Sequence, residues 1–146
     1  MRRLRVLVVD DEPSLLQLLR VTLESEGHDV LLASDGETAV RRIVAERPDI
    51  VLLDVMMPVL DGWGVLQEVK SLEAPPRVVC LTAKAGRRDQ LKGWQLGTDE
   101  YVTKPFNTER LLELVQEVVA RSAEEQEARR REALAALGET APPAGG

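Results

Sequence analysis

The chain has 146 residues, of which 44% are hydrophobic and 30% charged, and its formal net charge is −6. This length and composition are typical of a single globular domain with a substantial core, and the acidic balance excludes the broad basic face with which proteins bind duplex DNA. The single cysteine and the single histidine exclude an intramolecular disulfide, a cysteine-based zinc cage and a multi-histidine metal site.

No apolar run in the sequence reaches the roughly 18 residues that a membrane-spanning helix needs. A short apolar run follows the basic N-terminus, but Asp10 and Asp11 interrupt it too early for a signal peptide. Cys80 lies inside the apolar stretch RVVCLT, where we expect a buried thiol. We therefore expect a cytoplasmic protein with no membrane partner.

Short and nearly continuous apolar runs recur along the chain and predict five strands. They do not alternate with polar residues, which favours strands that are buried on both faces, as in a parallel sheet. The predicted strands cover residues 4–9, 29–33, 49–54, 77–82 and, more weakly, 100–102.

Amphipathic patterns between and after these runs predict five helices. Pro13 suits the first turn of the first helix, and Gly27 suits its end. The clearest apolar stripe belongs to the last helix and consists of Leu111, Leu112, Leu114, Val115, Val118 and Val119. The alternation of strands and helices predicts an α/β, doubly wound layer sandwich.

The sequence after the fifth apolar stripe is polar on all sides. We therefore expect residues 1–121 to form the domain and residues 122–137 to be a solvated polar extension of the last helix, supported by Glu–Arg pairs at helical spacing. Residues 138–146 are rich in glycine and proline and are expected to be a disordered tail. An alternative is that the extension docks on a partner through Leu134 and Leu137.

Several polar residues fall at the carboxyl ends of the predicted strands. They are Asp10, Asp11, Asp54, Thr82 and Lys104. Ligands in open α/β sheets bind at this edge, where the strand order reverses. We take the strand order 2-1-3-4-5 from known sheets of this type rather than from the sequence. With that order, the first two aspartates lie beside the third.

Each of these residues also has an ordinary structural interpretation. Asp11 could cap the first helix, with Glu12 favourable to the helix dipole. A single aspartate at a strand end usually forms a turn, Thr82 could be a strand-end hydroxyl, and Lys104 could be a surface lysine. These interpretations do not explain why all of the residues gather at one edge of one sheet.

Three carboxylates so close together repel one another, and a hard divalent cation removes that repulsion. Mg²⁺ suits oxygen ligands and also accepts phosphate oxygens. The cation and Lys104 could neutralise two phosphoryl oxygens, Thr82 could donate to the third, and a carboxylate could attack phosphorus. Spacing alone leaves the nucleophile among three aspartates, of which Asp54 is best placed, at the end of the central strand.

With these residues in place, the sequence resembles the receiver domains of two-component response regulators, which have the chemotaxis-type (CheY-like) fold. The resemblance covers residues 4 to about 120, and its matching stretches are VLVVDDEP, DGETAV, PDIVLLDVMMPVLDGWGVL, VVCLTA and GTDEYVTKPF. The resemblance implies a flavodoxin-like (βα)5 sandwich with a five-stranded parallel sheet of order 2-1-3-4-5. Together with the polar segment, the expected fold has an extended C-terminal helix.

The resemblance implies that Asp54 accepts a phosphoryl group from the phosphohistidine of a sensor histidine kinase or a histidine phosphotransfer protein. It implies a Mg²⁺ site formed by Asp11, Asp54 and the backbone carbonyl of Met56, with Asp10 acting through water or orientation. We therefore expect a phosphoacceptor that assists its own phosphorylation and dephosphorylation, rather than a conventional enzyme.

The resemblance also implies a two-state switch. Thr82 and Lys104 match the residues that bind the phosphoryl oxygens, and Tyr101 matches the aromatic that moves inward when Thr82 moves. The Lys104–Pro105 peptide bond is expected to be cis. Phosphorylation would then alter the face made by the fourth helix, the fifth strand and the fifth helix, where a downstream protein or a second copy of the chain would bind.

Two positions in the family pattern tune the rate of dephosphorylation. They are occupied here by Met56 and Lys84, which lie two residues after Asp54 and Thr82. An apolar group and a cation at these positions could screen the attacking water, so we expect slow dephosphorylation.

Four functions compete at this stage. The first is a stand-alone receiver, and the second is the receiver part of a multidomain transcriptional regulator. In the second case residues 122–137 would be a linker helix, and DNA binding within this chain is not expected. The third is a Mg²⁺-dependent phosphohydrolase, which would commonly need an acid where Met56 stands. The fourth is a receiver that no longer accepts phosphate, against which the full set of site residues argues.

Overall fold

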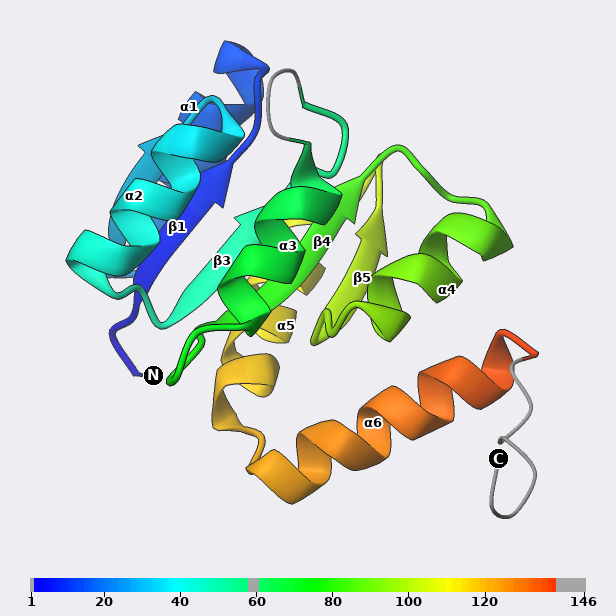
Figure 1. Ribbon diagram of the computed structural model, residues 1–146. Helices are drawn as coiled ribbons and strands as arrows, with labels where there is room; N and C mark the ends of the chain where they lie inside the picture. The colour runs from blue at the N-terminus through cyan, green and yellow to red at the C-terminus, as the bar shows by residue number, and fades with distance from the viewer. Residues whose placement is uncertain (1, 58–60, 139–146) are drawn as a thin grey trace.

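The computed structural model describes residues 2–57 and 61–138 and contains a parallel sheet between two layers of helices (Figure 1). The strands are β1 (Arg5–Val9), β2 (Asp29–Ala33), β3 (Ile50–Leu53), β4 (Arg77–Thr82) and β5 (Glu100–Thr103). Their order is β2-β1-β3-β4-β5, and every neighbouring pair is parallel. The predicted fold class and strand order are therefore confirmed.

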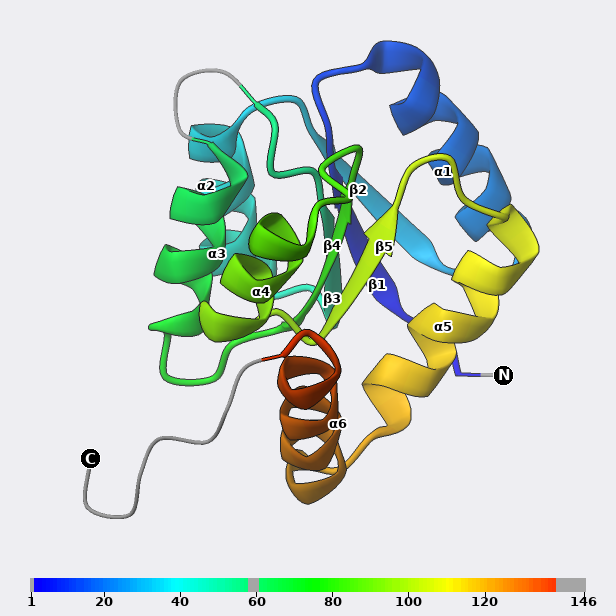
Figure 2. The same cartoon turned by 90° about the vertical axis from the view of Figure 1, so that its right-hand side faces the viewer.

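Helices cover both faces of the sheet. They are α1 (Pro13–Ser25), α2 (Gly36–Glu46), α3 (Gly62–Lys70), α4 (Arg87–Gln95), α5 (Thr108–Ala120) and α6 (Ala123–Ala136). Helices α1 and α5 lie on one face of the sheet, and α2, α3 and α4 lie on the other (Figure 2). The loops that follow the strands therefore gather at one edge, where the predicted site residues lie.

The central strands are buried on both faces, which explains their continuous apolar sequences. In β3, Ile50 and Leu52 pack with α1 and α5, whereas Val51 and Leu53 pack with α2 and α3. Full burial of such a side chain contributes about 1.5–3 kcal/mol. Cys80 in β4 is buried as expected, and burial raises the pKa of its thiol to about 12.

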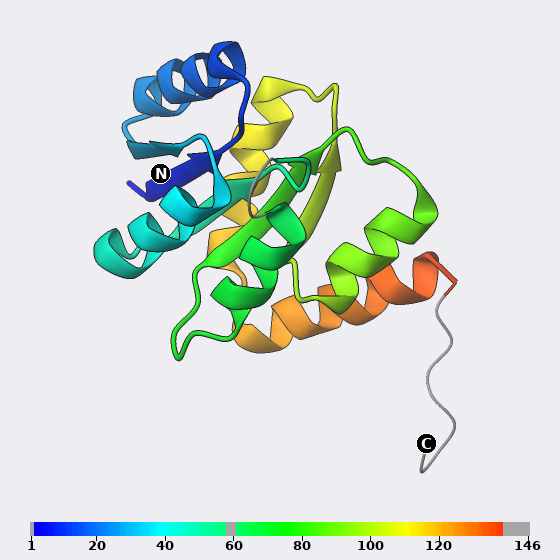
Figure 3. The same ribbon diagram turned by 45° about the horizontal axis from the view of Figure 1, so that its top comes forward.

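The predicted extension of the last helix is wrong, because the helix ends at Ala120. Arg121 adopts extended backbone angles, with φ −66° and ψ 136°. A second helix then begins with a capping box: the Ser122 hydroxyl accepts from the Glu125 N–H, and the Glu125 carboxylate accepts from the Ser122 N–H, both at 3.0 Å. The chain turns at this point, and α6 runs back beside α4 (Figures 1 and 3).

The expectation that this segment is solvated on all sides is also wrong. One face of α6 packs on the rest of the domain, and its most buried residues are Gln126, Ala133 and Leu134. Because this face of α6 contains glutamine and arginine as well as apolar residues, the sequence of the helix does not show an amphipathic pattern.

Within residues 2–57 and 61–138, no helix combines the length and apolar character required to cross a membrane. The tail predicted over residues 138–146 lies, apart from Gly138, outside the described residues.

His28 is buried between the end of α1 and the start of the sheet, with 5% of its surface exposed. Its Nδ1 accepts a hydrogen bond of 3.0 Å from the Leu4 N–H, and its Nε2 lies 3.3 Å from the side-chain amide of Gln116. Burial lowers the pKa of His28 and outweighs the opposing effect of the Glu26 charge. The folded protein therefore favours the neutral imidazole.

Mild acid is expected to destabilise the protein through His28. Since its folded-state pKa lies below the unfolded value of 6.5, the stabilising contribution is complete above that pH and is lost as the pH falls toward the folded-state pKa. Urea unfolding at about pH 7.5 and about pH 5.5 should show a larger loss of stability in the wild type than in His28→Gln, whose amide does not titrate. An equal loss in both proteins would contradict this role.

Candidate functional site

The sheet register brings Asp10 and Asp54 side by side. Val9 and Leu53 are paired residues at the ends of β1 and β3, and each aspartate follows directly. The backbone N–H of Asp54 donates to the Val9 carbonyl at 2.9 Å, and that of Asp10 donates to Ala33 at 3.1 Å. The hydrogen-bonded ladder thus fixes where both side chains leave the sheet.

Three carboxylates meet at this edge, as the sequence predicted. One oxygen from each of Asp10, Asp11 and Asp54 lies within 4.8 Å of the others. Asp10 is 2% exposed and Asp54 6% exposed, whereas Asp11 faces solvent. The cluster therefore combines two desolvated acids with one that remains accessible.

Lys104 supplies the compensating charge. It follows β5, and its Nζ donates to Asp10 Oδ2 at 2.7 Å and lies 3.2 Å from Asp54 Oδ2. Burial opposes the charged form of Lys104, but the hydrogen bond to Asp10 and the charges of Asp10 and Asp54 outweigh it, so its pKa lies above the ordinary value. The ammonium is therefore charged at neutral pH.

Backbone donors orient the second oxygen of each buried acid. The Met56 N–H donates to Asp54 Oδ1 at 2.9 Å, and the Glu12 N–H donates to Asp10 Oδ1 at 2.9 Å. In the described part of the chain, α1 begins after Glu12 without a side-chain cap. The alternative in which Asp11 caps this helix is therefore wrong.

Thr82 and Tyr101 are connected through the loop after β4. The fully buried Thr82 hydroxyl accepts from the Lys84 N–H at 3.2 Å. Tyr101 donates from its hydroxyl to the Lys84 carbonyl at 2.6 Å, and its ring lies against Gly93 of α4. Burial raises the pKa of the Tyr101 phenol above its usual value. The aromatic side chain is thus already turned inward in this structure.

The remaining predicted residues lie around the same edge. The Lys104–Pro105 bond is cis, as expected. The Met56 side chain is 50% exposed, and Lys84 is half-buried. Their backbones are bonded to the site, because the Met56 N–H donates to Asp54 and the Lys84 N–H donates to Thr82.

Sequence reasoning missed the role of Gly62, the first residue of α3. A Cβ at this position would lie 2.1 Å from the Val55 Cα and 2.5 Å from the Asp54 carbonyl oxygen. Only glycine allows this close approach of two backbones. The available signal was a glycine immediately after Asp61, the residue that caps α3.

The donor set fits Mg²⁺. The acid cluster offers only carboxylate oxygens, which are hard ligands, and Asp11 remains accessible to a solvated ion. The lysine beside them could contact an anionic group bound at the same place. The arrangement can therefore hold both a cation and a phosphoryl group.

Comparison with known proteins gives one consistent family. Residues 6–116 match the model of the response regulator receiver domain. The chain is 42% identical over 118 residues to the alkaline phosphatase synthesis transcriptional regulatory protein PhoP of Bacillus subtilis. This match covers 81% of the chain and 49% of PhoP, so the chain spans about half the length of that relative.

Solved structures with the same fold include CheY4 of Vibrio cholerae, a chemotaxis response regulator, at 31% identity and a TM-score of 0.75, covering 80% of this chain and 99% of CheY4. The BeF3-activated receiver domain of DrrB is 32% identical with a TM-score of 0.75, covering 82% of this chain and all of that domain. A CheY-like receiver protein of Methanospirillum hungatei is 27% identical with a TM-score of 0.77, covering 88% and 99% of the two chains.

Mg²⁺ is expected to stabilise the folded protein, because it binds the acid cluster only when the strands are paired. A ligand at a hundredfold excess over its dissociation constant adds about 2.7 kcal/mol to the free energy of unfolding. Urea unfolding with and without Mg²⁺ should show a gain in the wild type that Asp11→Asn largely loses. The control Glu113→Gln removes an exposed carboxylate on α5 and should keep the gain. A gain that survives Asp11→Asn would place the ion elsewhere.

Proposed function

Because the chain belongs to the family of response regulator receiver domains, which are phosphoacceptor signalling domains, we propose that Asp54 accepts a phosphoryl group and makes the protein a phosphorylation-dependent switch. The donor is the phosphohistidine of a sensor histidine kinase or phosphotransfer protein, and the compartment is the cytoplasm. The observation that carries this proposal is the buried Asp10–Lys104–Asp54 ion pair beside Asp11 and Thr82.

The chain prepares Asp54 for nucleophilic attack. The Met56 N–H and the Lys104 ammonium hold the two carboxylate oxygens, which limits rotation of the side chain. One oxygen attacks phosphorus, the phosphorus–nitrogen bond to the donor imidazole breaks, and the imidazole leaves with that electron pair. Lys104 remains charged throughout and offsets the negative charge of the transferred group.

The Mg²⁺ ligands we propose are the carboxylates of Asp11 and Asp54 and the Met56 carbonyl, with Asp10 acting through water or orientation. The ion supplies charge neutralisation for the phosphoryl oxygens. Because Asp10 already accepts from both Glu12 and Lys104, its main role is to orient the lysine.

The switch that we propose runs through Thr82. If its hydroxyl turns toward the phosphoryl group, the hydrogen bond from the Lys84 N–H is lost. The loop that contains the Lys84 carbonyl, to which Tyr101 donates, then shifts. This connects the acid cluster to the face of α4, β5 and α5, which a downstream protein or a second copy of the chain would recognise.

We favour a stand-alone receiver that acts through a protein partner. The alternative is the receiver part of a multidomain transcriptional regulator, and the coverage of only 49% of PhoP supports it. In either case the site chemistry is the same, and nucleic-acid binding would not belong to the acidic sheet edge.

Incubation with a small-molecule phosphodonor and Mg²⁺ is expected to add one phosphoryl group to the wild type, as measured by intact mass. Asp54→Asn should show no addition, because its amide is not a nucleophile. The control Glu113→Gln keeps the site and should be labelled like the wild type. An unlabelled wild type, or a labelled Asp54→Asn, would contradict the proposal.

Phosphorylated Asp54 is expected to be long-lived, because the Met56 side chain and the Lys84 cation screen the attacking water. Replacing Met56 by asparagine introduces a polar group that can orient water and should shorten the lifetime by about tenfold, which corresponds to about 1.4 kcal/mol in the barrier. The measurement is the decay of the phosphorylated mass after the donor is removed. A wild-type half-life of seconds, or an unchanged lifetime in Met56→Asn, would count against screening.

A further inference from the structure

Helix α6 lies along α4 and crosses the start of β5 (Figures 1 and 3). Near the end of α4, Arg130 Nε donates to the Trp94 carbonyl at 3.0 Å. At the other end, a Cβ on Gly138 would lie 3.0 Å from a guanidinium nitrogen of Arg87, the first residue of α4. The two helices are therefore antiparallel, and α6 covers α4 along its length.

The apolar part of this contact is small and well buried. Trp94 is 2% exposed and packs against Ala133 at 5% and Leu134 at 8%. Leu91, Tyr101 and Leu137 surround this cluster. Because Trp94 belongs to neither of the two clusters that flank the sheet, its burial depends on α6.

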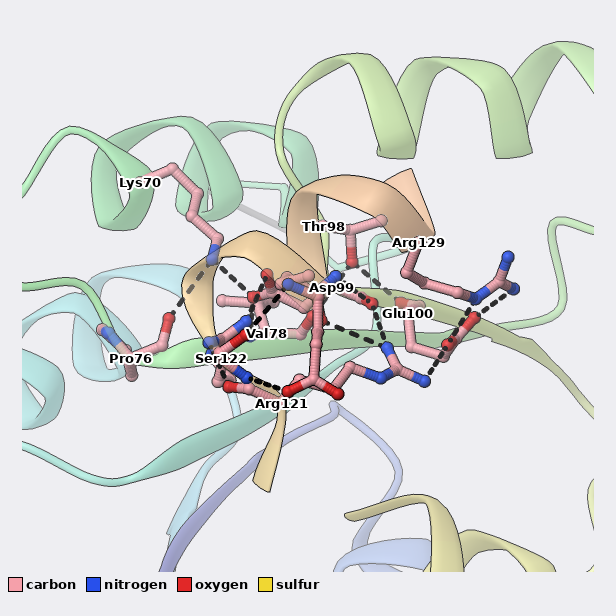
Figure 4. Close-up of polar contacts among 12 residues, drawn as sticks. Lys70, Pro76, Val78, Thr98, Asp99, Glu100, Arg121, Ser122 and Arg129 are labelled. Carbon is pink, nitrogen blue, oxygen red and sulfur yellow. Dashed lines mark hydrogen bonds and ion pairs between the residues drawn. The ribbon is translucent and has the colours of Figure 1, made fainter. Parts of the chain in front are cut away.

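The polar part of the contact is centred on Glu100, which is 6% exposed (Figure 4). Arg129 of α6 binds its carboxylate in a bidentate manner, with Nη2 2.8 Å from Oε1 and Nε 3.1 Å from Oε2. Arg121 adds a third contact at 3.0 Å. The Arg129 guanidinium also lies 5.0 Å from the centroid of the Trp94 ring, within cation–π range.

The receiver also presents backbone acceptors to this helix. Gln126 donates to the Asp99 carbonyl at 2.8 Å, and Arg130 contacts the carbonyls at the C-terminus of α4. A helix C-terminus favours a cation. The α4–β5 surface, defined here as Trp94, Asp99 and Glu100 with Leu91, therefore combines an apolar patch, a buried acid and backbone carbonyl acceptors. Its chemistry matches an amphipathic helix that carries arginine and leucine on one face.

Several features indicate that α6 is detachable. Among the described residues, the two large clusters that flank the sheet contain none from α6. The helix has its own capping box and joins α5 through the extended Arg121. The family match ends at residue 116, before α6 begins. The two clusters that flank the sheet are thus formed without side chains from this helix.

We propose that the α4–β5 surface is a binding site for an arginine-bearing amphipathic helix and that α6 is its tethered occupant. An external helix with the same pattern then binds only when α6 leaves. This inference goes beyond the phosphorylation switch and does not depend on it, because it rests on contacts outside the acid cluster.

The first test releases α6 in the full chain. Arg129→Glu places a carboxylate against Glu100 and should undock the helix, whereas Arg131→Glu makes the same charge change at an exposed position of α6. In a Trp63→Phe background, acrylamide quenching reports Trp94 alone. Quenching should rise strongly in Arg129→Glu and stay at the parental value in Arg131→Glu, while the urea midpoint of the receiver core is unchanged.

The second test supplies the helix from outside, as a peptide of residues 122–138. It should bind Arg129→Glu and restore the protection of Trp94, and a peptide carrying Leu134→Ser should bind more weakly. Binding to the wild-type chain should be about tenfold weaker or more, as expected if α6 occupies the surface for about nine-tenths of the time or longer.

Three outcomes would overturn the proposal. Equal binding of the peptide to the wild type and Arg129→Glu would mean that its site is not beneath α6. Loss of the whole fold in both Arg129→Glu and the milder Leu134→Ser, but not in the exposed control Ala135→Ser, would make α6 part of the core. A dimeric wild type with Trp94 protected only in the dimer would mean that the surface is occupied by the α6 of a second copy.

Discussion

The ion pair between Lys104 and the two buried aspartates is the interaction on which the site depends. Burying a carboxylate without a partner is expensive, and removing one member of a buried pair typically costs about 3–5 kcal/mol. Here the β1 and β3 ends supply Asp10 and Asp54, and the residue after β5 supplies the ammonium. The Lys104 N–H is also bonded to the Thr82 carbonyl at 2.8 Å. Four strand ends are therefore held in one arrangement by charge and backbone together.

Most of this edge could be predicted from the sequence, because two physical rules determine it. Continuous apolar runs require strands that are covered on both faces, and parallel strands place their carboxyl ends at the same edge. These rules place Asp10, Asp54 and Lys104 at one edge of the sheet without any knowledge of side-chain geometry, and the strand order then makes Asp10 and Asp54 neighbours. The strand order itself came from known folds, and the function of each residue came from the family resemblance.

The C-terminal segment was predicted wrongly for a physical reason. Its contact face contains Gln126, Arg129 and Arg130 as well as Ala133 and Leu134, so hydrophobic periodicity does not mark it. The break after Ala120 has no glycine or proline, which are the usual signals for the end of a helix. One local signal was present, the Ser122–Glu125 capping box, and it marks the start of a new helix rather than the extension of an old one.

The Tyr101 side chain lies between the acid cluster and the α4–β5 surface and contacts elements of both. Tyr101 donates to the Lys84 carbonyl in the loop that begins at Thr82, and its ring also contacts the cluster formed by Trp94 and α6. Contiguous packing of this kind is a physical route by which one site can bias another, provided that the intervening element has two arrangements. The α4–β5 surface and the Thr82 loop therefore contact the same aromatic side chain. Binding linkage is reciprocal. If a ligand bound at the acid cluster changes the free energy of α6 docking, then α6 docking changes the binding free energy of that ligand by the same amount.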